Sequence, residues 1–309
     1  MRKDQAPPVT DLEYVTARLH GRRSRMAEAE RLHALCRSPG LSDLARAVAA
    51  GAEPGSFARF QRDRADDLRR EVEGFLRHAS GPGAAFLRWA LARFELDDWK
   101  LRRRREAGAS PDGLHDPGAR AVATEALASR PGDARPFLVE AAADRGYLGE
   151  LLARAARLPA GDRAHVVPLA CQEADVFHVQ LVARGRFGYG VEAAQLASFH
   201  VAGTCVTRRA FEAMLREATL AEAARRLARR AIDAVPPEAA DAAMLEALAW
   251  QRYRALANRA FRRAPIGWGA VAGYVALRRL EVANLVTVSE GVRLGVPEDE
   301  VRRRLVPPG

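Results

Sequence analysis

The segment from Glu281 to Gly291 reads Glu281-Val-Ala-Asn-Leu-Val-Thr-Val-Ser-Glu-Gly291, with an acid ten positions before a glycine. Two other segments align with it without gaps: Asp98-Trp-Lys-Leu-Arg-Arg-Arg-Arg-Glu-Ala-Gly108 and Asp175-Val-Phe-His-Val-Gln-Leu-Val-Ala-Arg-Gly185. Each lies near the end of a long block of helix-forming residues, where glycine commonly caps a helix C-terminus. The repeat therefore predicts three related helical units that end near Gly108, Gly185 and Gly291, with these glycines as caps.

The composition favours helix throughout the chain. Hydrophobic residues make up 48% of the 309 residues and aromatic residues only 6%, while the abundant alanine, leucine, arginine and glutamate are strong helix formers. Proline and glycine divide the sequence into blocks with apolar residues at helical spacing, such as Leu87, Leu91 and Phe94. We expect an all-α fold without a sheet, with antiparallel helical units at 11–116, 117–205 and 206–309 after a flexible N-terminus at 1–10.

The chain is strongly basic, and its positive charge is almost all arginine. Lysine and arginine number 49 against 39 acidic residues, which gives a formal net charge of +10. The run Arg102 to Arg105, preceded by Trp99 and Lys100, has residue types that bind phosphates and stack on bases. Cations also complement the negative end of a helix dipole, and we favour a solvated helix end for this run. A helical nucleic-acid-binding or regulatory protein stays open as an alternative.

Membrane-spanning and secretory signals are absent from the sequence. The stretch from Ala264 to Leu277 has no charged residue but is shorter than the roughly 18 apolar residues that span a bilayer. The N-terminal residues 1–8 contain no apolar core of a signal peptide. We expect a cytosolic chain in which Cys36, Cys171 and Cys205, odd in number and widely spaced, stay reduced.

No familiar catalytic spacing is found. The sequence lacks a phosphate-binding loop, a zinc-binding HExxH helix, a nucleophile elbow and a dinucleotide-binding glycine turn. Cys171 and His178 are two helical turns apart, about 10 Å along a helix, which is too far for a thiol and base pair. We therefore expect no catalytic residue, cofactor or metal.

An all-helical enzyme that uses scattered histidine and cysteine groups stays open as a second alternative. The seven histidines are His20, His33, His78, His115, His165, His178 and His200.

The repeat acids Asp98, Asp175 and Glu281 lie within apolar helical segments. A buried ionised carboxylate needs a partner, and arginine offers two parallel hydrogen bonds. We expect these acids to be structural. Arg18, on the first predicted helix, is the expected partner of one of them.

Three stretches near the C-terminus carry a family resemblance: Pro265-Ile-Gly-Trp-Gly-Ala-Val-Ala-Gly-Tyr274, Glu281-Val-Ala-Asn284-Leu285 and Gly291-Val-Arg-Leu-Gly-Val-Pro-Glu-Asp-Glu-Val301. The opening helix from Tyr14 to Met26 and the segment Asp175 to Gly185, followed by Tyr189-Gly190 and Gly203, extend it over the chain. In these features the chain resembles the AC39 family, which contains the C subunit of the archaeal and bacterial A/V-type rotary ATPase (ATP synthase) and its relative in the vacuolar ATPase, the d subunit. The asparagine of the acid-x-x-Asn-Leu pattern stands at Asn284, with Leu101 and His178 at the aligned positions.

The resemblance implies three related helical units in a funnel-like arrangement and a non-catalytic rotor adaptor. Such an adaptor joins the central-stalk subunits D and F to the membrane rotor ring and transmits torque for coupled ATP turnover and proton or sodium transport. It is peripheral, on the cytoplasmic side of the membrane, and neither a small-molecule substrate nor nucleic acid is expected. The expected structural residues are Asp98, Gly108, Asp175, Gly185, Glu281, Asn284, Gly291 and Arg18. Candidate interface arginines, which could face acidic loops or lipid headgroups although we favour a solvated face for them, are Arg102, Arg103, Arg104, Arg184 and Arg186.

Overall fold

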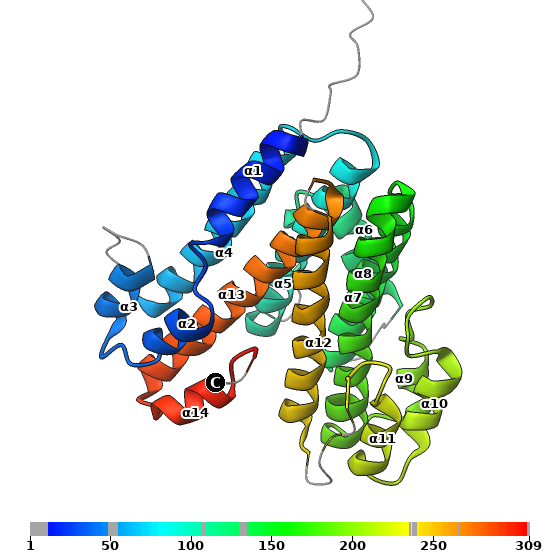
Figure 1. The fold of residues 1–309 in the computed structure, drawn as a ribbon. Coiled ribbons are helices and arrows are strands. Elements are labelled where there is room, and N and C mark those ends of the chain that lie inside the picture. The colour runs from blue at the N-terminus through cyan, green and yellow to red at the C-terminus, as the bar shows by residue number, and fades with distance from the viewer. Residues whose placement is uncertain are drawn as a thin grey trace, which may run out of the picture. The chain divides into compact units, whose positions relative to one another are not determined.

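The computed structural model describes residues 12–48, 55–106, 109–129, 135–234, 236, 240–264 and 266–307. The predicted flexible N-terminus at 1–10 lies outside these residues. Within them no β-strand forms, and the β-type pairing is an isolated bridge between Ala228 and Ile232. The predicted all-α fold is therefore confirmed. In chain order the elements (Figure 1) are α1 (Leu12–Arg23), α2 (Ala29–Leu35), α3 (Leu41–Val48), α4 (Phe57–Leu76), α5 (Gly81–Arg105), a 3₁₀ turn η1 (Pro111–Gly113), α6 (Pro117–Ala128), α7 (Pro136–Ala156), α8 (Ala160–Gln180), a π-helix η2 (Leu181–Gly188), α9 (Ala193–Ala197), α10 (Arg208–Arg216), α11 (Leu220–Leu227), α12 (Ala242–Arg263), α13 (Trp268–Leu294) and α14 (Glu298–Arg303).

The helices pack into two compact units. Unit 1 comprises the described residues of 1–80 and 254–309, and unit 2 those of 81–253, so the boundary falls inside α12. These two units are defined by contacts between helices, whereas the three predicted units are defined by similarity between segments of the sequence. The predicted boundaries at 116 and 205 stay a prediction.

Helix ends follow the capping residues of the sequence. Asp116 accepts the N–H of Ala119 at 2.9 Å and precedes Pro117, the first residue of α6. Thr219 and Glu222 form a reciprocal capping box at the start of α11. At the other end of a helix, Gly295 adopts a left-handed conformation with φ 64° and ends α13.

Unit 1 is organised around α13. This helix packs against α1, α3, α4 and α14, and its residues Leu285 and Val288 join a buried apolar cluster with Leu44, Phe60 and Leu305. Burial of each such large apolar side chain is worth about 1.5–3 kcal/mol. The apolar spacing of α13 therefore supplies the core of the unit.

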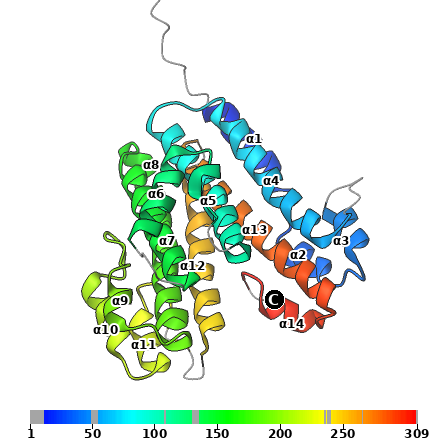
Figure 2. The same ribbon diagram turned by 180° about the vertical axis from the view of Figure 1, so that it is seen from behind.

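Unit 2 contains a packed group of long helices and a group of short ones. Helix α7 contacts α5, α6 and α8, and α9, α10 and α11 lie together around η2 (Figure 2). Trp89 of α5 donates its indole N–H to the carbonyl of Tyr147 in α7 at 2.9 Å and stacks on the same tyrosine ring. A buried tryptophan thereby fixes the position of α5 against α7.

Helices α12 and α13 come into close backbone contact within unit 1 at Gly273. A Cβ atom at this position would stand 2.6 Å from the carbonyl oxygen of Ala257 and 2.7 Å from the backbone nitrogen of Phe261. Both neighbours are backbone atoms of α12, which cannot move aside as a side chain can. We expect Gly273→Ala to lower the free energy of unfolding by about 1–3 kcal/mol, as overpacking does, in urea titrations followed by circular dichroism.

Gly149 supplies the matched control. It lies in α7, and a Cβ there would meet nothing within 4 Å. Gly149→Ala should therefore stabilise the chain by about 0.5–1 kcal/mol, because alanine is the better helix former. Equal effects of the two substitutions would contradict the close approach at Gly273.

Candidate functional site

Asp175 is fully buried on α8 and holds a distant stretch of backbone. Its carboxylate oxygens accept the N–H groups of Cys205 at 3.1 Å and of Val206 at 3.0 Å. These residues lie in the segment between α9 and α10, where backbone donors have no helical partner. Asp175 thus ties this segment to α8 through charge-assisted hydrogen bonds.

His178, one turn further along α8, completes the same connection. Its Nδ1 lies 3.3 Å from Oδ1 of Asp175, and its Nε2 accepts the N–H of Val201 at 3.0 Å. This arrangement requires a neutral imidazole with its proton on Nδ1. Burial lowers the pKa of His178, partly offset by the neighbouring Asp175 carboxylate. The ring also stacks on His200 with centroids 4.8 Å apart.

The C-terminal repeat makes the corresponding contacts in unit 1. Glu281 accepts the N–H of Ala27 at 2.5 Å and also pairs with Arg278. Asn284 accepts the N–H of Val306 at 2.9 Å and donates its own amide to the Val306 carbonyl at 3.0 Å. An acid and the residue three positions later therefore hold backbone amides in α13 as they do in α8.

The first repeat uses a different acid from the predicted one. Asp98 is exposed on α5, and Leu101 is 47% exposed. Glu95, one turn earlier, accepts the N–H groups of His115 at 2.6 Å and of Asp116 at 3.0 Å. The prediction that Asp98 is one of the buried acids is therefore wrong. The signal for Glu95 was its position one helical turn before the aligned acid, ahead of the Asp116-Pro117 helix start.

Arg18 does not pair with Glu281 as the sequence analysis allowed. Its guanidinium contacts Tyr14, with a hydrogen bond of 3.2 Å to the hydroxyl and 5.4 Å to the ring centroid. The arginine beside Glu281 is Arg278, on the same helix. Asp175 in turn is partnered by backbone amides and His178. The prediction of an arginine partner from the first helix is therefore wrong.

The repeat glycines are points of close packing. Gly185 lies inside η2, where a Cβ would stand 3.0 Å from the side chains of Phe137 and Leu196. Gly291 lies inside α13 against Val301 of α14, and the cap of α13 is Gly295. The prediction that Gly185 and Gly291 cap helices is therefore wrong, and Gly108 lies outside the described residues.

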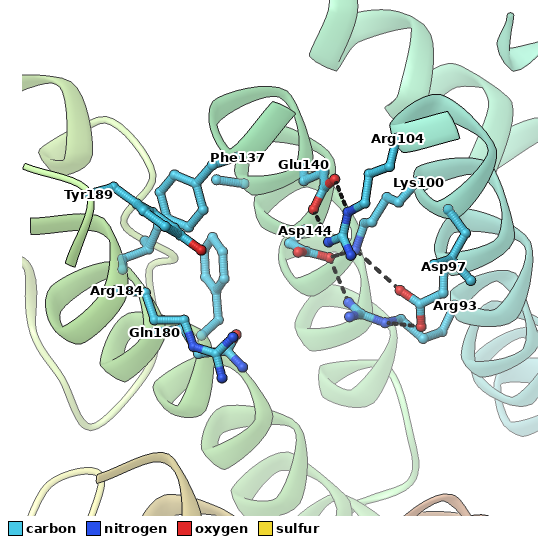
Figure 3. Close-up of a pocket in the computed structure, with 14 residues that line it drawn as sticks. Arg93, Asp97, Lys100, Arg104, Phe137, Glu140, Asp144, Gln180, Arg184 and Tyr189 are labelled. Atoms are coloured by element: carbon cyan, nitrogen blue, oxygen red, sulfur yellow. Dashed lines mark hydrogen bonds and ion pairs between the residues drawn. The ribbon is translucent and has the colours of Figure 1, made fainter. Parts of the chain in front are cut away.

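A cavity of about 390 Å³ opens in unit 2 among α5, α7, α8 and η2 (Figure 3). One side is a network of charged residues from α5 and α7. Arg93 bonds to Asp144 at 2.7 Å and to Asp97 at 3.0 Å. Lys100 also bonds to both of these acids. The cations on this side are therefore matched by carboxylates.

The opposite side of the cavity combines aromatic rings with Arg184. Phe137 and Tyr189 meet edge to face with centroids 5.1 Å apart (Figure 3). Arg184, placed by the π-helix η2, pairs with Glu246 of α12 through two hydrogen bonds. Tyr189 is 63% exposed, and together with Leu101 it forms an apolar rim. Aromatic and arginine side chains of this kind are enriched where proteins contact one another.

The five predicted interface arginines have different positions. Arg102 is exposed beside Gly113, and Arg103 is partly buried. Arg186 donates to the carbonyl of Leu215 at 3.1 Å. Arg104 and Arg184 line the cavity of Figure 3.

Arg104 makes two hydrogen bonds to Glu140, and these raise the pKa of its guanidinium. Sequence reasoning missed Glu140 and Glu246, the acids that hold Arg104 and Arg184. Phe137, Glu140 and Asp144 share one face of α7 through their helical spacing. That spacing was the available signal for the acidic side of the cavity.

Other kinds of site are not found in the described part of the chain. No group of three or more histidine, cysteine, aspartate or glutamate side chains there is arranged to hold a metal ion. No described helix is long and apolar enough to cross a membrane. Cys36, Cys171 and Cys205 are free thiols. Burial raises the pKa of Cys171 to about 12, and its Sγ donates to the carbonyl of Gly203 at 3.2 Å.

Removal of the Asp175 acceptor should destabilise the chain. In Asp175→Asn one oxygen becomes an amide donor that faces a backbone N–H, which leaves a buried donor unsatisfied. We expect a loss of about 1–3 kcal/mol in the free energy of unfolding, measured by urea titration. Asp98→Asn, at the exposed acid of the aligned repeat, is the control and should change stability by less than about 0.5 kcal/mol. Equal losses would refute the anchoring role of Asp175.

The neutral state of His178 predicts a dependence of stability on pH. Its pKa is lowered in the folded chain, so below the unfolded value of about 6.5 the unfolded state binds a proton that the folded state excludes. The free energy of unfolding should therefore fall as the pH drops from about 6.5 towards the lowered folded pKa. Urea titrations at intervals of pH measure this slope, and His178→Asn should reduce it. An unchanged slope in the variant would contradict a neutral buried His178.

A family model described as the ATP synthase (C/AC39) subunit matches residues 113–304 of the chain. The match includes Asp175, His178, Glu281 and Asn284 and spans well over half of the 309 residues. Among curated proteins, no significant match is found. The chain therefore belongs to the ATP synthase (C/AC39) subunit family, the family of the C and d subunits of A/V-type ATPases.

Proposed function

We propose that this chain is the non-catalytic rotor adaptor of an A/V-type rotary ATPase. It joins the central-stalk subunits D and F to the membrane rotor ring and transmits torque for coupled ATP turnover and proton or sodium transport. The observation that carries the proposal is the family match over residues 113–304. In this role the chain is peripheral on the cytoplasmic side of the membrane and is held there through the complex.

The bonds from carboxylates to backbone amides support a torque-transmitting role. A part that passes on torque must keep its helices from moving against the segments between them. Glu95 and Asp175 each bind two consecutive backbone amides, and Glu281 binds one amide and Arg278. These bonds are directional, and those to Val206 and Ala27 are buried, so they oppose sliding in a way that apolar packing alone does not.

The cavity in unit 2 supplies the surface that we propose for a neighbouring subunit. Arg104 and Arg184 are more than half exposed, while their partners Glu140 and Glu246 are nearly buried. The buried acids hold the exposed guanidinium groups in place before any partner arrives, which lowers the entropic cost of binding. Tyr189 and Leu101 add exposed apolar area beside them.

Affinity purification tests the proposed role. The tagged chain is recovered from membranes of its own cell after mild detergent treatment, and the proteins that accompany it are identified by mass spectrometry. We expect the central-stalk subunits and the rotor ring, because an adaptor contacts both. Recovery of neither, from a sample in which the complex is otherwise intact, would refute the role and return attention to nucleic acid.

Substitution at the cavity rim tests the proposed surface. Leu101→Asp combined with Tyr189→Ala removes exposed apolar area and should leave the fold intact, since Leu101 is 47% and Tyr189 63% exposed. If these residues form an energetic centre of the interface, a loss of about 2 kcal/mol or more would weaken binding of the neighbouring subunit by more than about tenfold. Quantitative mass spectrometry of the purified complex measures the change.

Leu294→Asp is the matched control, because Leu294 is 61% exposed on α13 of unit 1 and does not line this cavity. It should leave recovery of the partner subunits unchanged. Normal recovery with the rim variant would show that this surface is not the interface, while the adaptor role would still be judged by the purification itself.

A further inference from the structure

Unit 1 contains a second cavity, of about 470 Å³, whose lining is rich in arginine. Five guanidinium groups line it, from the C-terminal end of α1, the turn after α1, α4 and α13: Arg22, Arg25, Arg64, Arg70 and Arg278. Three carboxylates, those of Asp67, Glu71 and Glu281, line it as well. Five positive and three negative groups leave an excess of two positive charges in one concave site.

The two deeper carboxylates already bind donors of the protein itself. Glu71 accepts the hydroxyl of Tyr274 at 2.6 Å, Arg278 Nε at 3.2 Å and Arg22 at 2.5 Å, and its side chain is 9% exposed. Glu281 is bound by the Ala27 N–H and by Arg278. These contacts fill three of the about four acceptor positions of Glu71 and two of those of Glu281, and neither acid bonds to Arg25, Arg64 or Arg70.

The third carboxylate is shared, and two arginines keep unused donors. Asp67 serves both Arg64 at 2.8 Å and Arg70 at 2.5 Å. The Nε of Arg64 is buried and has no hydrogen-bond partner in the described structure. The guanidinium of Arg25 bonds to no acceptor among the described residues. The exposed guanidinium of Arg25 lines the cavity with donors that no protein acceptor occupies, so a ligand that supplies acceptors can bind there.

We propose that this cavity binds a phosphoryl group. Phosphate carries about −1.5 to −2 charges at neutral pH, which matches the excess of two positive groups. Its oxygens also fit the planar fork of arginine through paired hydrogen bonds. The volume lies in the range of small-ligand sites, roughly 300–1,000 Å³. A soluble polyphosphate and the headgroup of an anionic lipid present this same chemistry, and the site does not depend on the rotor role.

Calorimetric titration of the full chain with inorganic pyrophosphate, at constant ionic strength, tests the soluble ligand. Arg25→Gln removes an unpartnered guanidinium and breaks no ion pair, and Arg25→Gln with Arg70→Gln removes two cations from the exposed side of the cavity. We expect the dissociation constant of the double variant to rise by at least about tenfold, since hydrogen bonds between charged groups are lost. Thermal unfolding of each variant verifies that it is folded.

Arg46→Gln is the control, because Arg46 is 71% exposed on α3 of the same unit and does not line the cavity. It makes the same change in net charge as Arg25→Gln and should leave binding unchanged. If Arg46→Gln weakens pyrophosphate binding as much as Arg25→Gln does, binding reflects the overall charge of the chain and the proposal is overturned.

Flotation with phosphatidic acid vesicles, whose headgroup is a phosphate monoester, tests the lipid source, with phosphatidylcholine vesicles as the neutral reference. Binding to the anionic vesicles that is lost in Arg25→Gln with Arg70→Gln, and is competed by pyrophosphate, assigns the site to a lipid headgroup. Pyrophosphate binding without vesicle binding assigns it to a soluble polyphosphate. If the wild-type chain binds neither probe, or if the double variant binds both as the wild type does, the proposal is wrong.

Discussion

A carboxylate on one helix that accepts backbone N–H groups of a distant segment is the interaction on which both units of this protein depend. In unit 2 Asp175 accepts the amides of Cys205 and Val206, and Glu95 accepts those of His115 and Asp116. In unit 1 Glu281 accepts the amide of Ala27. In each case the donors lie outside a helix, where they lack intrahelical partners. Several charge-assisted bonds offset the cost of burying the charge. The position of the helix and the conformation of the segment are therefore determined together.

His178 and Asn284 show how different side chains meet the same requirement. They stand three residues after Asp175 and Glu281 in the aligned repeats, and each accepts a backbone N–H, from Val201 and Val306 respectively. The amide of asparagine has no titration in the physiological range, whereas imidazole accepts only while it is neutral. The replacement of asparagine by histidine keeps the contact and makes it sensitive to protonation.

Composition and proline spacing sufficed to predict the all-α fold, and the repeat located Asp175 and Glu281. The partners of these acids were beyond sequence reasoning, because every residue has a backbone amide and no residue type marks the one that bonds. The same limit explains Asp98: it and Glu95 lie one turn apart on α5, and only packing decides which acid faces inward. Glycine is equally ambiguous, since Gly185 and Gly295 suit close packing and capping respectively.

The net charge of +10 describes the whole chain but no particular surface. In unit 2 the cations of the cavity are held by acids, as Arg104 is by Glu140 and Arg184 by Glu246, so shape and aromatic area dominate what that cavity can recognise. In unit 1 the arginines outnumber the carboxylates, and Arg25 has no acceptor among the described residues. A matched charge network suits a protein surface, whose own charges vary in position, whereas an excess of guanidinium groups suits a compact anion. The same residue type therefore supports two kinds of recognition, and the number of carboxylates beside it determines which.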